Sequence, residues 1–442
     1  MKLKLKPLLS AVHPRTEHTN IQRWLLPLFR DRSIAKRFKS NASPPKASDP
    51  LRILFCGSDE FSCANLRALH AEHVRNPSLV ESIDVVVRPG KRVGRGYKKI
   101  QHPLLRDVAT ELGLPIHERD TFTGWDMPAA TNLIIAVSFG LFVPRRLLGA
   151  AKYGGLNMHP SLLPDLRGPA PLHHTLLRQR PFTGVTLQTL DHHNFDAGTV
   201  LAQTHLRNAY RIPDACTVPQ LQDALAPLAA EMLVDGLRRG LHVPPHADAG
   251  WLPRAESPGP GQDDVLALEL DKDAMAPKIT PRLRQLLPVW EPDFTRQGVG
   301  LPWSADMAAL TQRTIGPLWF KAKDHAGHLK RVIVPGDVES ITLGAFDEDL
   351  VRYRTDLYGV TVSDEEETFR TSAVIFYLPN DDAMYLLESV KSDKTRQGGL
   401  RIRALKILTL KVEGERERPA RLAFEQFPKV EQKPLKSYKL CI

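Results

Sequence analysis

Two polar side chains near residue 158 have the types and spacing for chemistry. Asn157 and His159 are separated by one residue, and Pro160 ends the apolar stretch before them, because proline cannot continue a central strand. Alternate side chains of a strand point to the same face, so this carboxamide and imidazole can face one cleft. Both groups can donate to a single developing oxyanion. The pair is therefore a candidate for oxyanion stabilisation.

An acid further along the chain is the candidate third member of the site. Asp196 lies in an Asp-Ala-Gly turn before the apolar residues Val200 and Leu201, and its carboxylate could orient His159 and raise its basicity. Metal binding is the competing interpretation. We predict no metal site, because the sequence has no HExxH and adjacent histidines cannot point together on a regular element. The histidines considered are His173, His174, His192 and His193.

Alternating strands and helices must position these residues. Short apolar runs at 51–56, 82–87, 132–140 and 154–161 alternate with stretches of helical spacing at 61–74, 103–113 and 144–148. This pattern predicts an α/β fold, a mostly parallel Rossmann-like sheet with flanking helices. Ligands of such sheets bind beyond the carboxyl ends of the strands. The sequence contains neither GxGxxG nor GxxxxGK[ST], which argues against a dinucleotide fold or a P-loop.

Charge is distributed unevenly along the 442 residues. The net charge is +10, but residues 1–50 and 391–442 each carry +8, and the remainder carries −6. The basic, acid-poor first fifty residues have interrupted apolar pieces, which indicates a mitochondrial targeting segment that ends in a flexible junction at 41–50. A basic arm that touches RNA is the alternative.

No apolar run reaches the roughly 20 residues of a membrane helix, and the four cysteines form no CxxC pair.

Two joined motifs, the first at 157–164 and the second at 183–199, carry a family resemblance. The stretches NMHPSLLP (157–164), TGVTLQTLD (183–191) and DAGT (196–199) have the order and spacing of the folate-dependent formyltransferases, which the chain resembles. The basic glycine-rich stretch GKRVGRGYKK (90–99) is similar to a loop that the tRNA-formylating branch of this superfamily inserts after its second strand. Its Gly-Arg-Gly core places Arg95 at the position of an arginine essential in that branch.

The resemblance implies a reaction and a role for each residue. The donor would be 10-formyltetrahydrofolate, and the acceptor would be the α-amine of methionine on initiator tRNA in the mitochondrial matrix. Asn157 and His159 would stabilise the oxyanion, Asp196 would hold His159 and take up the amine proton, and no metal would be needed. The expected folate contacts are Ser161, Leu162, Leu163, Pro164 and Asp191; the expected tRNA contacts are Lys91, Arg92, Arg95, Lys98, Lys99, Arg401, Arg403 and Lys406.

The resemblance also suggests how the chain is divided. We expect a targeting segment at 1–50, a formyltransferase catalytic domain at 51–242, a linker at 243–264 and an OB-like β-barrel that docks tRNA at 265–442. The alternating basic and apolar residues of 400–414 predict one strand of that barrel. The acidic insertion at 345–370 has no assignable role. A monomer is the default expectation.

Two other functions compete with this interpretation. The first is another 10-formyltetrahydrofolate-dependent formyltransferase or hydrolase that acts on a small molecule, which would share the Asn, His and Asp set but lack the basic loop. The second is an RNA-binding protein that has lost catalysis, against which the intact set of Asn157, His159 and Asp196 argues.

Overall fold

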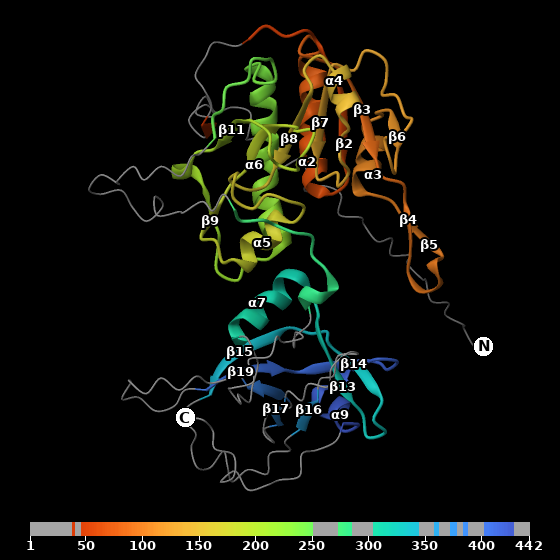
Figure 1. The fold of residues 1–442 in the computed structure, drawn as a ribbon, viewed down its shortest axis with the longest axis vertical. Helices are drawn as coiled ribbons and strands as arrows, with labels where there is room; N and C mark the ends of the chain where they lie inside the picture. The colour runs from red at the N-terminus through yellow and green to blue at the C-terminus, as the bar shows by residue number, and fades with distance from the viewer. Residues whose placement is uncertain are drawn as a thin grey trace, which may run out of the picture.

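The computed structural model describes residues 38–39, 46–250, 273–284, 304–343, 358–361, 372–377, 383–387 and 402–427. These residues form two domains, drawn one above the other in Figure 1. The upper domain, red to green, is a sheet covered by helices, and the lower domain, teal to blue, consists mainly of strands. No helix in this described part is long and apolar enough to cross a membrane.

An eight-stranded sheet forms the centre of the first domain. Its spatial order is β1-β11-β10-β8-β7-β2-β3-β6. The strands β6, β3, β2, β7 and β8 run parallel, as predicted, whereas β10, β11 and β1 add an antiparallel edge next to β8. The strand bounds are β1 Phe38–Lys39, β2 Leu51–Gly57, β3 Val80–Val87, β6 Ile116–Glu118, β7 Leu133–Val137, β8 Gly155–His159, β10 Thr186–Thr189 and β11 Val200–Thr204.

Helices cover the sheet, and two of them, α2 and α6, begin at residues whose side chains accept from the first N–H groups. The Asp59 side chain accepts a hydrogen bond from Ser62 N at the start of α2, and Thr217 and Gln220 form a capping box at the start of α6. The helices are α2 Glu60–Arg75, α3 Leu104–Glu111, α4 Arg145–Ala150, α5 Pro171–Leu177 and α6 Val218–Arg238, and the smaller elements are β4 Lys91–Val93, η2 Arg95–Tyr97, β5 Lys99–Gln101, β9 Phe182–Thr183, η3 Leu206–Asn208 and β12 Tyr210–Arg211.

Strand β2 shows why this sheet is buried on both faces. Its residues Leu51, Ile53 and Phe55 belong to the core cluster that contains residues of α2, α3 and α6. The alternating residues Leu54 and Cys56 belong to a second cluster, on the side of α4. Because successive strand residues point to opposite faces, a continuous apolar run is required here. Such a run, interrupted only by Arg52, is what the sequence has at 51–56.

The segment just before β2 is held on the first domain. The Lys46 ammonium donates to Val243 O at 2.9 Å, and Ser48 Oγ and His242 Nε2 lie 2.8 Å apart. The expectation of a flexible junction up to residue 50 is therefore wrong for residues 46–50. Most of the predicted targeting segment lies outside the described residues.

The beginning of the predicted linker is also docked. Ala249 is 3% exposed, and its N–H donates to Val200 O at 2.7 Å, on the antiparallel edge of the large sheet. Residues 251–264 of that linker lie outside the described part of the chain. The first domain thus includes residues up to 250.

The second domain has two antiparallel sheets around a common core. One sheet has the order β13-β14-β20-β21 and the other β15-β19-β18-β17-β16. Phe320, Leu405 and Phe424 belong to the shared core, to which α7 and α9 also contribute. The elements are η5 Pro281–Arg284, α7 Ala305–Ile315, β13 Leu318–Lys323, β14 Leu329–Val334, β15 Val338–Leu343, β16 Tyr358–Thr361, β17 Ser372–Tyr377, β18 Met384–Leu387, β19 Ile402–Ile407, β20 Thr409–Val412, β21 Arg418–Pro419 and α9 Ala420–Phe424.

The predicted single strand at 400–414 is wrong. The chain forms β19 and β20, which belong to different sheets, and Leu408 between them is 51% exposed. Leu405 and Ile407 point into the core before this break, and Leu410 and Val412 do so after it. The inward positions change from odd to even numbers across the break, and the adjacent apolar residues Ile407 and Leu408 mark this change of phase in the sequence. The acidic insertion predicted at 345–370 lies outside the described residues except for β16.

Candidate active site

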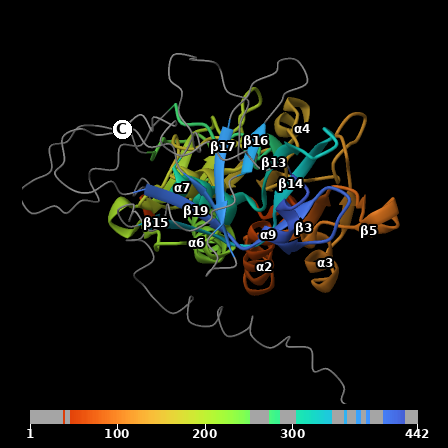
Figure 2. The same ribbon diagram turned by 90° about the horizontal axis from the view of Figure 1, so that it is seen from below.

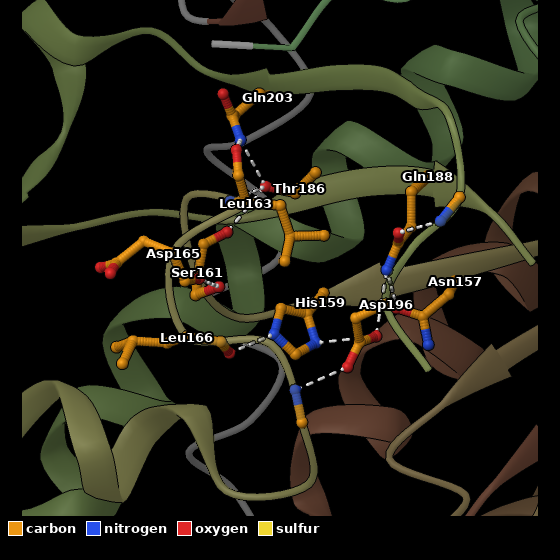
Figure 3. Close-up of polar contacts among 12 residues, drawn as sticks. Asn157, His159, Ser161, Leu163, Asp165, Leu166, Thr186, Gln188, Asp196 and Gln203 are labelled. Carbon is orange, nitrogen blue, oxygen red and sulfur yellow. Dashed lines mark hydrogen bonds and ion pairs between the residues drawn. The ribbon is translucent and has the colours of Figure 1, made fainter. Parts of the chain in front are cut away.

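Strand β8 ends in the candidate active site. Asn157 and His159 are both on this strand, which pairs with β7 on one side and with β10 on the other. Asn157 is half-buried and His159 is 4% exposed. Figure 3 shows the two side chains on the same side of the strand, beside Asp196. The structure therefore brings together the three residues that the sequence selected.

Asp196 is fixed on both of its carboxylate oxygens. Its Oδ1 lies 3.4 Å from His159 Nδ1, and the two side chains are 8% and 6% exposed. The N–H of Gly168 donates to Oδ2 at 2.9 Å (Figure 3). The backbone of Asp196 has φ +53°, in the left-handed region that few residues other than glycine adopt. This sharp turn directs the carboxylate back toward β8.

Gln188 is a site residue that the sequence analysis missed. It lies opposite Asn157 on the antiparallel strand β10 and is 1% exposed. Its Nε2 donates to Asp196 Oδ1 at 3.0 Å and to Asn157 Oδ1 at 3.3 Å, and its Oε1 accepts from Gly198 N at 3.2 Å. The Gly198 N–H is a fixed backbone donor, so it determines which way the Gln188 amide faces.

The amide of Asn157 is oriented by this contact. Since Asn157 Oδ1 accepts from Gln188, its Nδ2 group points away from that partner (Figure 3). Gln188 could have been found only from the register of β10 against β8, which the motif TGVTLQTLD does not reveal. The result is a polarised N–H group on a half-buried side chain at the carboxyl end of the parallel strands.

The imidazole of His159 lies between two acceptors. Its Nδ1 faces the Asp196 carboxylate, and its Nε2 lies 3.1 Å from Leu166 O. A neutral imidazole can donate to only one acceptor, whereas the imidazolium donates to both. The surroundings therefore suit a positively charged ring. The sequence analysis expected His159 to act with Asn157 on the oxyanion; in this structure Asn157 has an N–H group that points away from its partner, whereas both ring nitrogens of His159 face acceptors of the protein.

The loop that follows β8 is packed internally. Three of its four predicted folate contacts are at most 2% exposed, and the fourth is half-buried. Thr186 Oγ1 donates to Ser161 O at 2.7 Å. Gln203 Nε2 donates to Leu163 O at 2.8 Å. These contacts shape the turn that returns the chain to Leu166. The four residues are Ser161, Leu162, Leu163 and Pro164; their contact with folate stays a prediction.

The loop after β10 contains the fifth predicted folate contact. Asp191 accepts hydrogen bonds from His193 N and Asn194 N, at 2.8 and 2.7 Å, and these lower the pKa of its exposed carboxyl. Further along this loop, the ring of Phe195 meets that of Phe142 edge-on with centroids 5.4 Å apart. Aromatic side chains therefore bridge the loops that follow β7 and β10, next to the candidate catalytic residue Asp196 in the chain.

Phe142 also lines an open cavity of about 370 Å³. Besides that ring, residues from the loop after β6 and from the start of α4 line it, and none of the predicted site residues does. Its lining residues are Thr121, Phe122, Thr123, Gly124, Phe142, Pro144 and Arg146.

Comparison with known proteins agrees with this geometry. Residues 51–237 match the family model described as formyl transferase. The chain is 36% identical over 242 residues to the protein called methionyl-tRNA formyltransferase, mitochondrial, of Saccharomyces cerevisiae, and this match covers 46% of the chain and 59% of the yeast protein. It is 31% identical over 227 residues to methionyl-tRNA formyltransferase of Paracoccus denitrificans, covering 50% and 68%. The chain belongs to the methionyl-tRNA formyltransferase family.

A third relative gives the same result. The chain is 32% identical over 195 residues to methionyl-tRNA formyltransferase of Aromatoleum aromaticum, a match that covers 43% of the chain and 58% of that protein. The chain thus spans somewhat more than half the length of the yeast and Aromatoleum relatives that it matches.

In this member of the methionyl-tRNA formyltransferase family, the basic glycine-rich stretch is a hairpin. Strands β4 and β5 pair antiparallel, and Gly94 and Gly96 in the turn have φ +82° and +74°. Figures 1 and 2 show the hairpin projecting from the edge of the first domain. Tyr97 at its tip is 69% exposed. The predicted tRNA contacts Lys91, Arg92, Lys98 and Lys99 are exposed, and the side chain of Arg95 lies outside the described part of the structure.

The predicted tRNA contacts of the second domain are not gathered with those of the hairpin. Arg403 is exposed on β19 and forms an ion pair with Asp306 of α7. Lys406 on the same strand is half-buried. Arg401 lies outside the described residues. The two basic regions therefore belong to different domains (Figure 1).

Within the described residues, no group of three or more His, Cys, Asp or Glu side chains could hold a metal ion.

Proposed function

We propose that this chain transfers the formyl group of 10-formyltetrahydrofolate to the α-amine of methionine on initiator tRNA, in the mitochondrial matrix. The observation that carries the proposal is the convergence of Asn157, His159 and Asp196 at the carboxyl end of the parallel strands. The names of the relatives support the tRNA acceptor, and the name of the yeast relative together with the basic first fifty residues supports the mitochondrial location.

The side chains are suited to each stage of an acyl transfer. The amine nitrogen forms a bond to the formyl carbon, and the carbonyl oxygen of the formyl group becomes an oxyanion. Asn157 Nδ2 donates to this oxygen, and the His159 imidazolium stabilises its charge. The bond from the formyl carbon to the folate nitrogen then breaks, and that nitrogen takes a proton. Asp196 accepts the proton that the attacking amine loses, directly or through water.

The exposed cations of the hairpin suit a polyanionic acceptor. The exposed residues Lys91, Arg92, Lys98 and Lys99 belong to a hairpin whose turn has two glycines in the left-handed region, and Arg95 occupies that turn. Lysine and arginine contacts to phosphates position a nucleic acid and make binding depend on salt. We further infer that the second domain is an OB-like barrel that docks the tRNA; its two antiparallel sheets around one core support this inference.

The test is an acceptor comparison with the purified chain and 10-formyltetrahydrofolate. Charged initiator tRNA, glycinamide ribonucleotide and water alone are offered as acceptors, and the formylated products and free tetrahydrofolate are measured. The proposal expects formyl-methionyl-tRNA as the product. Turnover with glycinamide ribonucleotide, the small amine, should be at least about 100-fold lower than turnover with charged tRNA. Preferential use of the small amine would support the small-molecule alternative, and release of tetrahydrofolate without transfer would support a hydrolase.

A further inference from the structure

A short stretch that precedes the second domain lies against the catalytic loop. We call residues 273–280 the connecting segment and residues 166–170 the catalytic loop. Ala276 N donates to Arg167 O at 2.7 Å, and Ala170 N donates to Ala276 O at 3.1 Å. Met275 and Arg167 form a parallel β-bridge. The connecting segment is therefore bonded to the loop through its backbone.

Side-chain packing makes this contact close. Leu166, Ala274 and Ala276 form a buried cluster, with exposed fractions of 1%, 2% and 0%. Gly168 has φ +121°, and a Cβ atom there would lie 2.7 Å from Ala276 O. A glycine at 168 and small residues at 274 and 276 are what allow the two backbones to approach. A displacement of the segment would therefore move the loop.

The catalytic loop is also the part of the chain that holds the catalytic pair. Leu166 O accepts from His159 Nε2 at 3.1 Å, and Gly168 N donates to Asp196 Oδ2 at 2.9 Å. Leu166 has φ +59°, a conformation that is strained for a leucine. Its surroundings must therefore maintain the direction of its carbonyl, and the connecting segment is part of them.

Helix α5 anchors the segment at its other side. His174 Nε2 donates to Pro277 O at 2.9 Å, and Arg178 donates to Met275 O at 3.2 Å. Burial lowers the pKa of His174, which favours its neutral ring. Just beyond α5, Gln179 donates to the Met307 sulfur of α7 at 3.3 Å, and Figure 1 shows α5 directly above α7. The segment and this helix pair thus connect the two domains beside the active site.

We propose that the connecting segment is a positioning element of the active site, through which the second domain fixes His159 and Asp196. The segment touches no reacting atom. It holds the Leu166 carbonyl and the Gly168 N–H, and these hold the imidazole and the carboxylate. The kinetic consequence rests on the proposed function; the structural consequence, a fixed environment for His159 Nε2, does not.

The experiment uses the full chain with substitutions at the two anchors. Ala276→Pro removes the N–H that bonds Arg167 O, and His174→Leu removes the donor to Pro277 O. Both should lower kcat by about 10-fold or more while KM for charged tRNA and for the folate changes less than about twofold. His174→Gln, which keeps a donor, should restore most of kcat. Leu283→Ala, at an exposed position outside these contacts, is the control.

Nitrogen-15 NMR of histidine-labelled protein supplies the second measurement. In Ala276→Pro and His174→Leu the His159 Nε2 resonance should shift, and in Leu283→Ala it should not. Unchanged kcat with a raised KM for tRNA would overturn the proposal, because the segment would then only place the second domain. An unshifted His159 resonance in folded variants would overturn it as well. A wild-type chain that fails to formylate tRNA, with the resonance shifts as expected, would overturn the proposed function and leave this inference standing.

Discussion

Replacing Asp196 by asparagine removes a charge and keeps the shape of the side chain. The carboxylate accepts from Gly168 N at 2.9 Å, from Gln188 Nε2 at 3.0 Å, and lies 3.4 Å from His159 Nδ1. An asparagine has one acceptor oxygen. Whichever way the amide turns, its NH2 group faces at least one of these donors. Asp196→Asn therefore breaks the hydrogen bonds on one side of the carboxylate and also removes the negative charge beside the imidazole.

The size of the effect follows from these contacts. A hydrogen bond that involves a charged group contributes about 1.5–3 kcal/mol, and both Asp196 and His159 are buried, so solvent screens little of the lost interaction. We expect the activation free energy to rise by about 3–4 kcal/mol, which corresponds to a fall in kcat of about 200- to 1000-fold. KM for charged tRNA should change only a few-fold, because the contacts of Asp196 are with Gly168, Gln188 and His159 and not with the basic hairpin.

The assay is steady-state formylation of charged initiator tRNA, with Asp191→Asn as the matched control. Asp191 lies in the same loop but bonds only the exposed turn at His193 and Asn194 among the described residues. Asp191→Asn should therefore keep kcat within about threefold, although folate KM could reveal the contact predicted from the sequence. If Asp196→Asn retained more than a tenth of wild-type kcat, the role assigned to Asp196 would be refuted.

Three further results are expected. Gln188→Leu removes the donor to Asn157 and Asp196, so kcat should fall about 10- to 50-fold in the same assay with KM nearly unchanged. A rise in KM as large as the fall in kcat would contradict a positioning role. Lys98→Ala combined with Lys99→Ala should raise KM for tRNA and reduce its salt dependence, without changing KM for folate. Burial lowers the pKa of His242 from 6.5 to about 4, so the unfolded chain binds more protons between these values. Stability should be constant above pH 6.5 and fall by up to about 3 kcal/mol as pH drops to 4, and thermal melts of His242→Gln should lack this decline.

The sequence predicted the part of the site that one strand carries. The spacing of Asn157 and His159 sufficed to place both on one face of β8, and the motif match connected them to Asp196. The apolar runs also predicted the parallel strands of the sheet. These features depend on local periodicity, which a single sequence contains in full.

The remaining features depend on contacts between distant parts of the chain. Gln188 is defined by the register of two antiparallel strands, and the acceptor of His159 Nε2 is the backbone carbonyl of Leu166, which no side-chain motif can show. The position of Ala276 on the catalytic loop is likewise a backbone contact. The break at Leu408 is marked in the sequence only by a change of phase at Ile407 and Leu408, which a bulge within a single strand would also produce.

The central claim is that the Asn157 amide donates to the oxygen of the formyl group as it becomes charged. The most direct test is the single-turnover rate of formyl transfer from 10-formyltetrahydrofolate to charged initiator tRNA, measured for wild type and Asn157→Ala at saturating substrates. Loss of one oxyanion donor should slow this step by about 100- to 1000-fold, with binding of both substrates preserved. A variant that transfers the formyl group within threefold of the wild-type rate would contradict the account.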